Sequence, residues 1–102
     1  MLEQHAELIN DIRVRAAKVL ESFFFEPNDK LTREAISGQL NILLGNMNEL
    51  EDFTVLVDES NNTQERIKNN ELWVDLAIQP KGNSQFIYIP FRIEPKEKEK
   101  MT

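Results

Sequence analysis

Cysteine is absent from the 102-residue chain, histidine occurs once, and glycine occurs three times. Without cysteine the chain has no disulfide, thiolate metal site or thiol nucleophile, which fits folding in a reducing compartment. The glycines stand apart at positions 38, 45 and 82, so the sequence has no glycine-rich phosphate loop. No apolar run approaches the roughly 20 residues that a membrane helix requires, and charged residues interrupt the place of a signal peptide. We expect no membrane partner.

The charge balance is acidic, with 12 Lys and Arg against 18 Asp and Glu and a net charge of −6. Nucleic-acid binding needs clustered basic residues, so we expect no nucleic-acid partner. The length suits one small core. We expect a domain over residues 1–95, followed by a charged, solvent-exposed tail over 96–102 that alternates Lys and Glu.

The ionisable residues do not form a recognisable catalytic or metal-binding pattern. His5 stands among polar residues and is interpreted as a solvated surface histidine, because no further ligands lie nearby. Glu49, Glu51 and Asp52 fall where a helix gives way to a strand and favour turn geometry over general acid–base chemistry. Residues 58–62 loosely resemble a calcium loop but lack its glycine and closing glutamate. We therefore expect no catalytic residue, metal or cofactor.

Apolar residues at spacings of three and four predict a helix over residues 2–25 and a second over about 31–44. Pro27 ends the first helix, and Asn28 or Asp29 can cap the second, so Pro27, Asn28 and Asp29 are predicted to form a structural turn. Gly38 within the second helix suggests close packing of another backbone. Gly45 and Asn46 suit a left-handed C-terminal cap.

Beyond residue 50 the apolar period changes from helical to alternating, which predicts strands over 53–57, 72–79 and 86–93. A helical turn capped by Thr63 is expected between the first two strands. The fold class is α+β, with two N-terminal helices packed on one face of a small, mainly antiparallel sheet completed by strands from neighbouring chains. The predicted core consists of Ile9, Ile12, Ala16, Val19, Leu20, Phe23, Leu40, Leu43, Leu44, Val55, Leu72, Val74, Leu76 and Ile78.

Pro90 interrupts the last predicted strand, which is apolar on both faces. Proline cannot donate to a β-ladder, so Pro90 belongs on an edge strand with its missing N–H outward, or at a bulge. An exposed apolar edge favours pairing with another chain. The predicted partner-binding residues are Phe86, Ile87, Tyr88, Ile89, Phe91 and Ile93. Residues 80–85 are open to two interpretations: a hairpin loop, or a linker that donates the strand to a neighbour.

Two sequence motifs carry a resemblance to a known family. Phe-Glu-Pro-Asn-Asp at 25–29, followed by Asp-Glu-Ser-Asn-Asn-Thr at 58–63, is similar to the C-terminal domain of contractile-tail sheath proteins. The resemblance covers about residues 12–93. It implies a non-enzymatic structural protein of the phage virion, assembled in the host cytoplasm, whose sheet receives strands from neighbouring subunits. It further implies partners among tail sheath, baseplate and tail tube proteins, and a ring-forming homo-oligomer.

Sheath subunits are several times longer than this chain, which leaves three roles open. The favoured expectation is a sheath initiator, the small baseplate protein that presents a sheath-like sheet to the first sheath ring. Residues 46–51 stand where familiar initiators carry a Glu-Pro-Arg motif. One alternative is an excised C-terminal domain of the sheath protein itself. The other is an unrelated acidic adaptor that binds its partner by strand addition.

Overall fold

The computed structural model describes residues 5–94, in which two long helices precede the three strands of the sheet. The elements are α1 (Ala6–Glu21), α2 (Lys30–Gly45), β1 (Leu50–Leu56), α3 (Gln64–Lys68), β2 (Leu72–Pro80) and β3 (Ile87–Ile93). The predicted helix start at residue 2 and the predicted tail at 96–102 lie outside the described residues. The division of the chain into a domain and a tail therefore stays a prediction.

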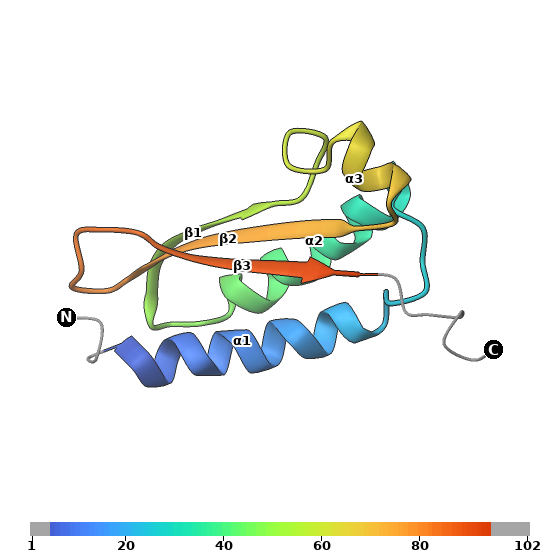
Figure 1. Cartoon of the computed structure of the whole chain (residues 1–102). Coiled ribbons are helices and arrows are strands. Elements are labelled where there is room, and N and C mark those ends of the chain that lie inside the picture. The colour runs from blue at the N-terminus through green and yellow to red at the C-terminus, as the bar shows by residue number, and fades with distance from the viewer. Residues whose placement is uncertain (1–4, 95–102) are drawn as a thin grey trace.

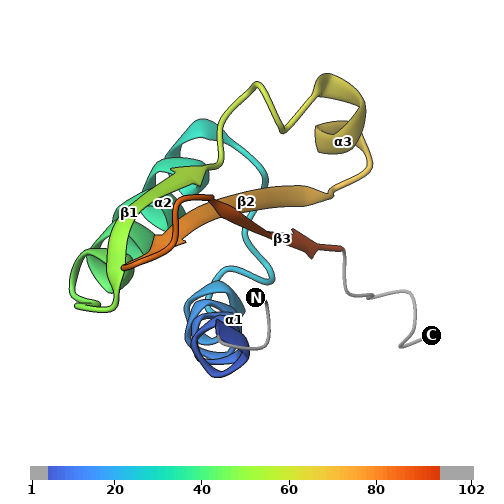
Figure 2. The same ribbon diagram turned by 90° about the vertical axis from the view of Figure 1, so that its left-hand side faces the viewer.

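The sheet has the strand order β1-β2-β3, and both strand pairs are antiparallel. α2 packs against β1, α1 packs against β3, and the two helices contact each other (Figure 1). The view in Figure 2 shows α3 apart from both long helices, at one end of the sheet. The predicted α+β class, with two N-terminal helices on one face of an antiparallel sheet, is confirmed.

The helix boundaries follow from local hydrogen bonding. α1 ends at Glu21 and not at residue 25, because Phe23 and Phe24 donate to carbonyls three residues back and continue the chain as turns. α2 begins after Asp29, whose side chain accepts from the N–H of Thr32 at 2.9 Å. Thr63 caps α3 in the same way, accepting from the N–H of Arg66.

Two expectations about glycine were wrong. A Cβ on Gly38 would meet nothing within 4 Å, so no neighbouring backbone approaches this exposed position. The C-cap residue Asn46 has φ −91°, which is not left-handed. Its N–H donates to Ile42 O at 3.2 Å, and Met47 donates to Leu44 O. These hydrogen bonds continue the chain as a turn, so the helix ends here without the positive φ that a left-handed cap requires.

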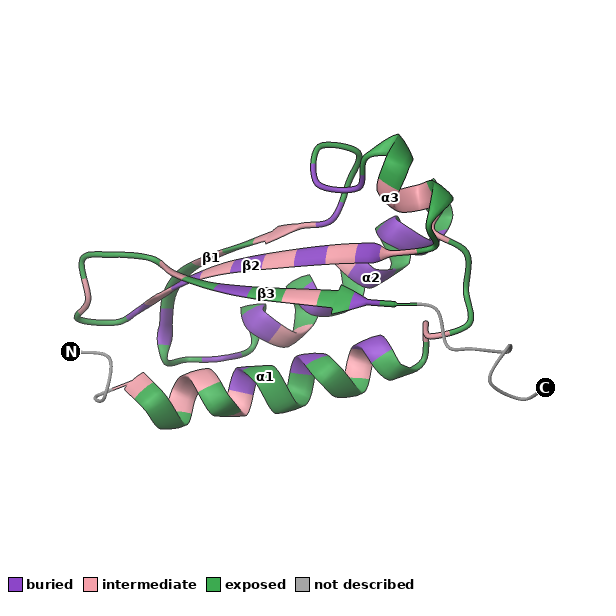
Figure 3. Ribbon diagram, viewed as in Figure 1, coloured by how far each residue is buried: buried purple, intermediate pink, exposed green. Residues whose placement is uncertain are grey.

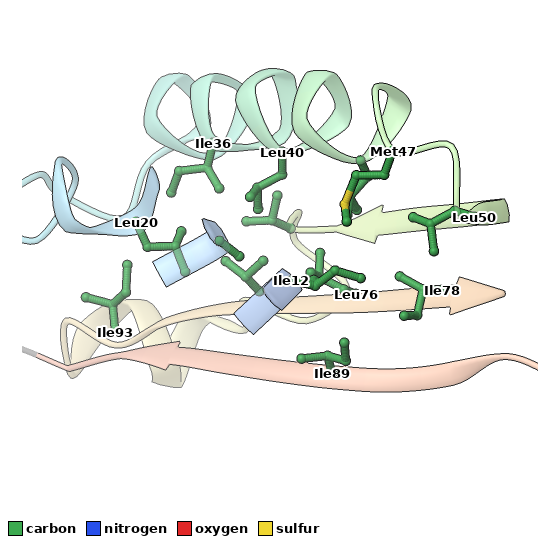
Figure 4. Close-up of a cluster of buried hydrophobic side chains, with 14 of the residues drawn as sticks. Ile12, Leu20, Ile36, Leu40, Met47, Leu50, Leu76, Ile78, Ile89 and Ile93 are labelled. Carbon is green, nitrogen blue, oxygen red and sulfur yellow. The ribbon is translucent and has the colours of Figure 1, made fainter. Parts of the chain in front are cut away.

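The core lies between the sheet and the two long helices, as Figures 3 and 4 show. Along β2, buried residues alternate with half-buried ones, so one face of the strand meets the helices. All predicted core residues are either buried or pack half-buried against the core, the latter being Ile9, Val19, Phe23, Leu43 and Val55. Sequence reasoning missed the buried apolar residues Ile36, Met47, Leu50, Val57, Ile89 and Ile93.

β2 and β3 form a hairpin within the chain, with Ile78 opposite Ile87 nearest the loop. In the loop, Gly82 has φ +83°, a conformation that side-chain-bearing residues rarely adopt. The loop is braced by Gln79, whose Nε2 donates to the carbonyl of Asn83 at 3.0 Å. Of the two interpretations of residues 80–85, the structure shows the hairpin.

Candidate assembly surface at the sheet edges

Both outer strands of the described sheet have an edge that no other described strand pairs with. β2 is central, so the outer edges belong to β1 and β3 (Figure 1). Unpaired N–H and C=O groups along such an edge can bind an extended segment of another chain through main-chain hydrogen bonds. The two edges are therefore the candidate assembly surface.

Asn61 and Asn62 show which main-chain groups point to which edge. Asn62 accepts from the N–H of Trp73 at 2.8 Å and donates to the carbonyls of Trp73 and Asp58, each at 3.0 Å. Asn61 accepts from the N–H of Asp58 at 3.0 Å. The two amide side chains thus bridge Asp58 and Trp73. In a continued β1–β2 ladder these two residues would form the next hydrogen-bonded pair. The main-chain groups of Trp73 consequently point toward β1.

Alternation along antiparallel strands then fixes the outer edge of β3. Because Trp73 points toward β1, the main-chain groups of Leu76 point toward β3, where the partner is Ile89. Tyr88, Pro90 and Arg92 therefore direct their main-chain groups away from the sheet. Pro90 lies on an edge strand with its missing N–H outward, as predicted, and no bond of the β2–β3 ladder is lost.

The six predicted partner-binding residues are divided between the two faces of β3. Ile89 and Ile93 are buried in the chain's own core, and Ile87 and Phe91 are half-buried against it. Tyr88 is 74% exposed and Phe86 is 38% exposed. The side chain of Ile89 is therefore part of the chain's own core. A partner at this edge would contact the main chain of β3 and the exposed aromatic residues.

The outer edge of β1 differs from that of β3. The same alternation directs the main-chain groups of Phe53 and Val55 away from the sheet. The N–H of Phe53 is already accepted by its neighbour Asp52 at 2.8 Å. The β1–β2 register also shifts between Leu50 and Asp52, which marks a bulge. The part of this edge that has a regular register and a free outward N–H is thus the C-terminal half of β1, at Val55.

The sheet face opposite the long helices carries exposed aromatic and basic side chains. Two guanidinium groups lie over the Trp73 ring, with Arg66 Cζ 3.5 Å and Arg92 Cζ 5.0 Å from its centroid. Beside it, Tyr88 and Phe86 border an open pocket of about 350 Å³, which is further lined by Thr54, Leu56, Asp75, Leu76 and Ala77. α3 supplies Arg66 and so packs against one end of this face.

The Pro27-Asn28-Asp29 turn is tied to the second sequence motif. Asn28 Nδ2 donates to Asn62 Oδ1 at 3.0 Å and to the carbonyl of Glu71 at 2.7 Å. Its Oδ1 accepts from Arg33 Nη1 at 2.6 Å. The turn is therefore anchored to the entry of β2. Its role as a purely structural element stays a prediction.

The motif at residues 58–63 did not predict how deeply some of its residues are buried. Asn62 is 1% exposed, Asn61 is 7% exposed, and Arg33 from α2 is 6% exposed. Buried polar groups require hydrogen-bond partners, and here the partners lie in three separate segments of the chain. The only signal in the sequence was the pair of adjacent asparagines directly after a strand.

Two carboxyl groups have perturbed pKa values. Hydrogen bonds from Thr32 lower the pKa of Asp29, and hydrogen bonds from Ser60 lower that of Asp58, with the Arg33 charge assisting in both cases. Both causes are local turn or cap geometry. Among residues 5–94, no three His, Cys, Asp or Glu side chains are grouped so as to hold a metal ion. His5 precedes α1 and makes no capping hydrogen bond with its side chain.

No helix in the described part of the chain is long and apolar enough to cross a membrane. No protein-family model and no solved structure matches the chain. The chain is 29% identical, over 87 residues, to the tail sheath protein of Vibrio phage KVP40, isolated from Vibrio parahaemolyticus in Japan. The match covers 82% of this chain but only 13% of that much longer protein. This similarity supports a domain related to phage tail sheath protein.

Proposed function

We propose that the chain is a structural component of a contractile phage tail that joins sheath subunits by strand addition. The observation that carries this proposal is the similarity to a tail sheath protein over most of the chain. The proposal assigns the chain no catalytic role. Its partners are tail sheath subunits, together with baseplate and tube proteins, in a ring of copies within the virion tail after assembly in the host cytoplasm.

The geometry of the sheet supports this mode of assembly. Both edges of the three-stranded sheet are unpaired among the described residues, while the face toward α1 and α2 is filled by the core. A strand added to either edge gains main-chain hydrogen bonds without any rearrangement of that core. The alternating pleat would fix its register, because a shift by one residue would move every side chain to the opposite face.

Within this proposal the chain acts as a sheath initiator at the baseplate. An initiator has to offer an acceptor edge before the first sheath ring forms, and a folded domain with open edges provides one. The alternative is that the sequence represents the C-terminal domain of the sheath protein itself. The acidic adaptor remains a third candidate, because strand addition at an open edge does not depend on a phage tail.

The direct test is cryo-electron microscopy of tails made by the phage whose genome encodes the chain. The initiator proposal expects the chain in one ring at the baseplate end of the sheath, with a strand from a neighbouring subunit paired to its sheet. Repetition of the domain along the whole sheath would instead establish the sheath-domain alternative. Absence of the chain from purified tails, or a sheet with no neighbour on either edge, would refute the proposal.

A biochemical test uses purified sheath subunits from the same genome. We expect substoichiometric amounts of the chain to shorten the lag before sheath polymerisation, followed by light scattering, because nucleation is then bypassed. The matched control is the chain unfolded by heat and cooled in denaturant, which keeps the composition and removes the sheet. An unchanged lag with the folded chain would contradict an initiating role.

A further inference from the structure

Arg33 is a nearly buried cation with few hydrogen bonds. Its residue is 6% exposed, and Nη1 donates to Asn28 Oδ1 at 2.6 Å. A guanidinium carries five N–H donors. None of the remaining donors has an acceptor within residues 5–94. Buried donors without partners are costly, so these donors indicate an acceptor beyond the described residues.

An open pocket lies beside Arg33, between the start of α2 and the end of β1. It has a volume of about 480 Å³ and is lined by Lys30, Arg33, Glu34, Val57, Asp58, Glu59 and Ser60. Val57, which lines this pocket, directly follows the last residue of β1. A strand paired to the β1 edge and running past Val57 would therefore enter the pocket.

The pocket offers a donor and an acceptor from different elements. Arg33 contributes free N–H groups from α2. On the other side, Asp58 Oδ1 accepts from the N–H and hydroxyl of Ser60, and the carboxylate has lone pairs beyond those that the Ser60 and Asn61 bonds use. No ion pair joins Arg33 and Asp58 in this part of the chain. A group inserted between them can accept from Arg33 and donate to Asp58.

The lining charges argue for a neutral ligand. Three carboxylates, Glu34, Asp58 and Glu59, outnumber the two cations, Lys30 and Arg33. An anionic ligand would gain from Arg33 but would be repelled by the carboxylates. A peptide unit is neutral and carries one acceptor and one donor. It therefore matches the N–H donors of Arg33 and the carboxylate acceptor of Asp58.

We propose that the β1 edge is the acceptor edge and that the Arg33–Asp58 pocket holds a main-chain peptide group of the added strand. This inference rests on the proposed function, which requires strand addition without deciding the edge. The edges themselves favour β1. On β1 the outward N–H of Val55 lies two residues before Val57 of the pocket, whereas the outer edge of β3 lacks a donor at Pro90, between Tyr88 and Arg92.

The test compares two matched proline variants for binding to the sheath subunit encoded by the same genome. Val55→Pro removes an outward N–H from β1, and Tyr88→Pro removes one from β3. Pro90 shows that an outward proline is compatible with a strand of this sheet. Val55→Ala and Tyr88→Ala control for the lost side chains. We expect Val55→Pro to weaken binding by roughly tenfold or more and Tyr88→Pro to have little effect.

The pocket is tested with Arg33→Lys and its control Glu34→Gln, which lies in the same lining but supplies no proposed contact. Lysine can keep one hydrogen bond to Asn28, but it lacks the other N–H donors of the planar guanidinium group. We expect Arg33→Lys to weaken binding roughly 10- to 100-fold. We expect Glu34→Gln to leave it unchanged and affinity to depend little on salt. Strong salt dependence and tighter binding by Glu34→Gln would show a carboxylate ligand and overturn the peptide assignment.

The outcomes separate this inference from the proposed function. Loss of binding in Tyr88→Pro alone would place strand addition on β3, which overturns the inference and leaves the proposed function intact. Loss in Val55→Pro with full binding by Arg33→Lys would reject the pocket. Absence of binding by the unmodified chain would instead count against the proposed function. Should a proline variant fail to fold, hydrogen exchange on the unmodified chain decides: added sheath subunit should protect the amide of Val55 and not that of Tyr88.

Discussion

Replacement of Asn62 by alanine should be among the most damaging single changes in the chain. Asn62 is 1% exposed, and its side chain is the acceptor for the N–H of Trp73 and for Nδ2 of Asn28. The carbonyls that it also contacts keep other donors: Trp73 O keeps Asn61 Nδ2, and Asp58 O keeps the main-chain N–H of residue 62. Asn62→Ala therefore leaves the N–H of Trp73 without an acceptor, removes one of the two acceptors of Asn28 Nδ2, and orphans no acceptor.

The magnitude follows from the loss of these acceptors. A buried donor left without a partner costs about 1–3 kcal/mol. Only the N–H of Trp73 loses its acceptor entirely, since Asn28 Nδ2 keeps the Glu71 carbonyl, so the free energy of unfolding should fall by roughly 1–3 kcal/mol. A domain of this size is stable by about 5–15 kcal/mol in total. The corresponding drop in Tm is on the order of 5–20 °C. The loss should exceed that of any exposed asparagine substitution.

Urea unfolding followed by Trp73 fluorescence measures the effect. Trp73 is the single tryptophan and is packed beside Arg66 in the folded chain, so its emission reports the transition. The matched control is Asn69→Ala, an exposed asparagine whose side chain makes no hydrogen bond in the described part of the chain. A loss below about 1 kcal/mol for Asn62→Ala, at an unchanged denaturant slope, would refute the reasoning from the orphaned donor.

Three further stability changes are expected. Leu76→Ala should lower the free energy of unfolding by about 2–5 kcal/mol, and Leu43→Ala by less, because Leu76 is fully buried and Leu43 only half-buried; equal losses in urea titrations would contradict the packing. Gly38→Ala should raise Tm, with a gain of up to about 1 kcal/mol, since nothing surrounds the position; a lower Tm would reveal an unseen contact. Asp29→Asn should lose stability relative to the unmodified chain above about pH 5, and this difference should shrink as pH falls below the ordinary pKa of 3.8, because hydrogen bonds from Thr32 lower the folded pKa. A difference independent of pH would exclude a charged cap.

Part of this fold is encoded locally. The spacing of Ile12, Ala16 and Leu20 predicts the buried stripe of α1, and the alternation from Leu72 to Ile78 predicts the inward face of β2. Asp29 and Thr63 cap helices through bonds to residues three positions away. Such features depend on interactions within one or two turns of chain, so residue type and spacing are enough to predict them.

The open edges were predictable for a similar reason. Pro90 cannot donate to a ladder wherever the strand lies, so its place on an edge follows from its covalent structure. The face of Ile89 did not follow from the sequence. The strand is apolar on both sides, and only pairing with β2 beneath α1 and α2 decided that Ile89 is buried while Tyr88 is exposed.

The sequence by itself determined the element order, the caps, the edge character of β3 and the acidic, cysteine-free surface that argues against nucleic acid. The tertiary structure alone decided the Asn61–Asn62 bridge, which joins residues 11 or more apart, and the pocket that Arg33 and Asp58 share. The physical reason is that a buried polar side chain is stable only where distant segments supply its partners. Those partners come together only when the helices close over the sheet.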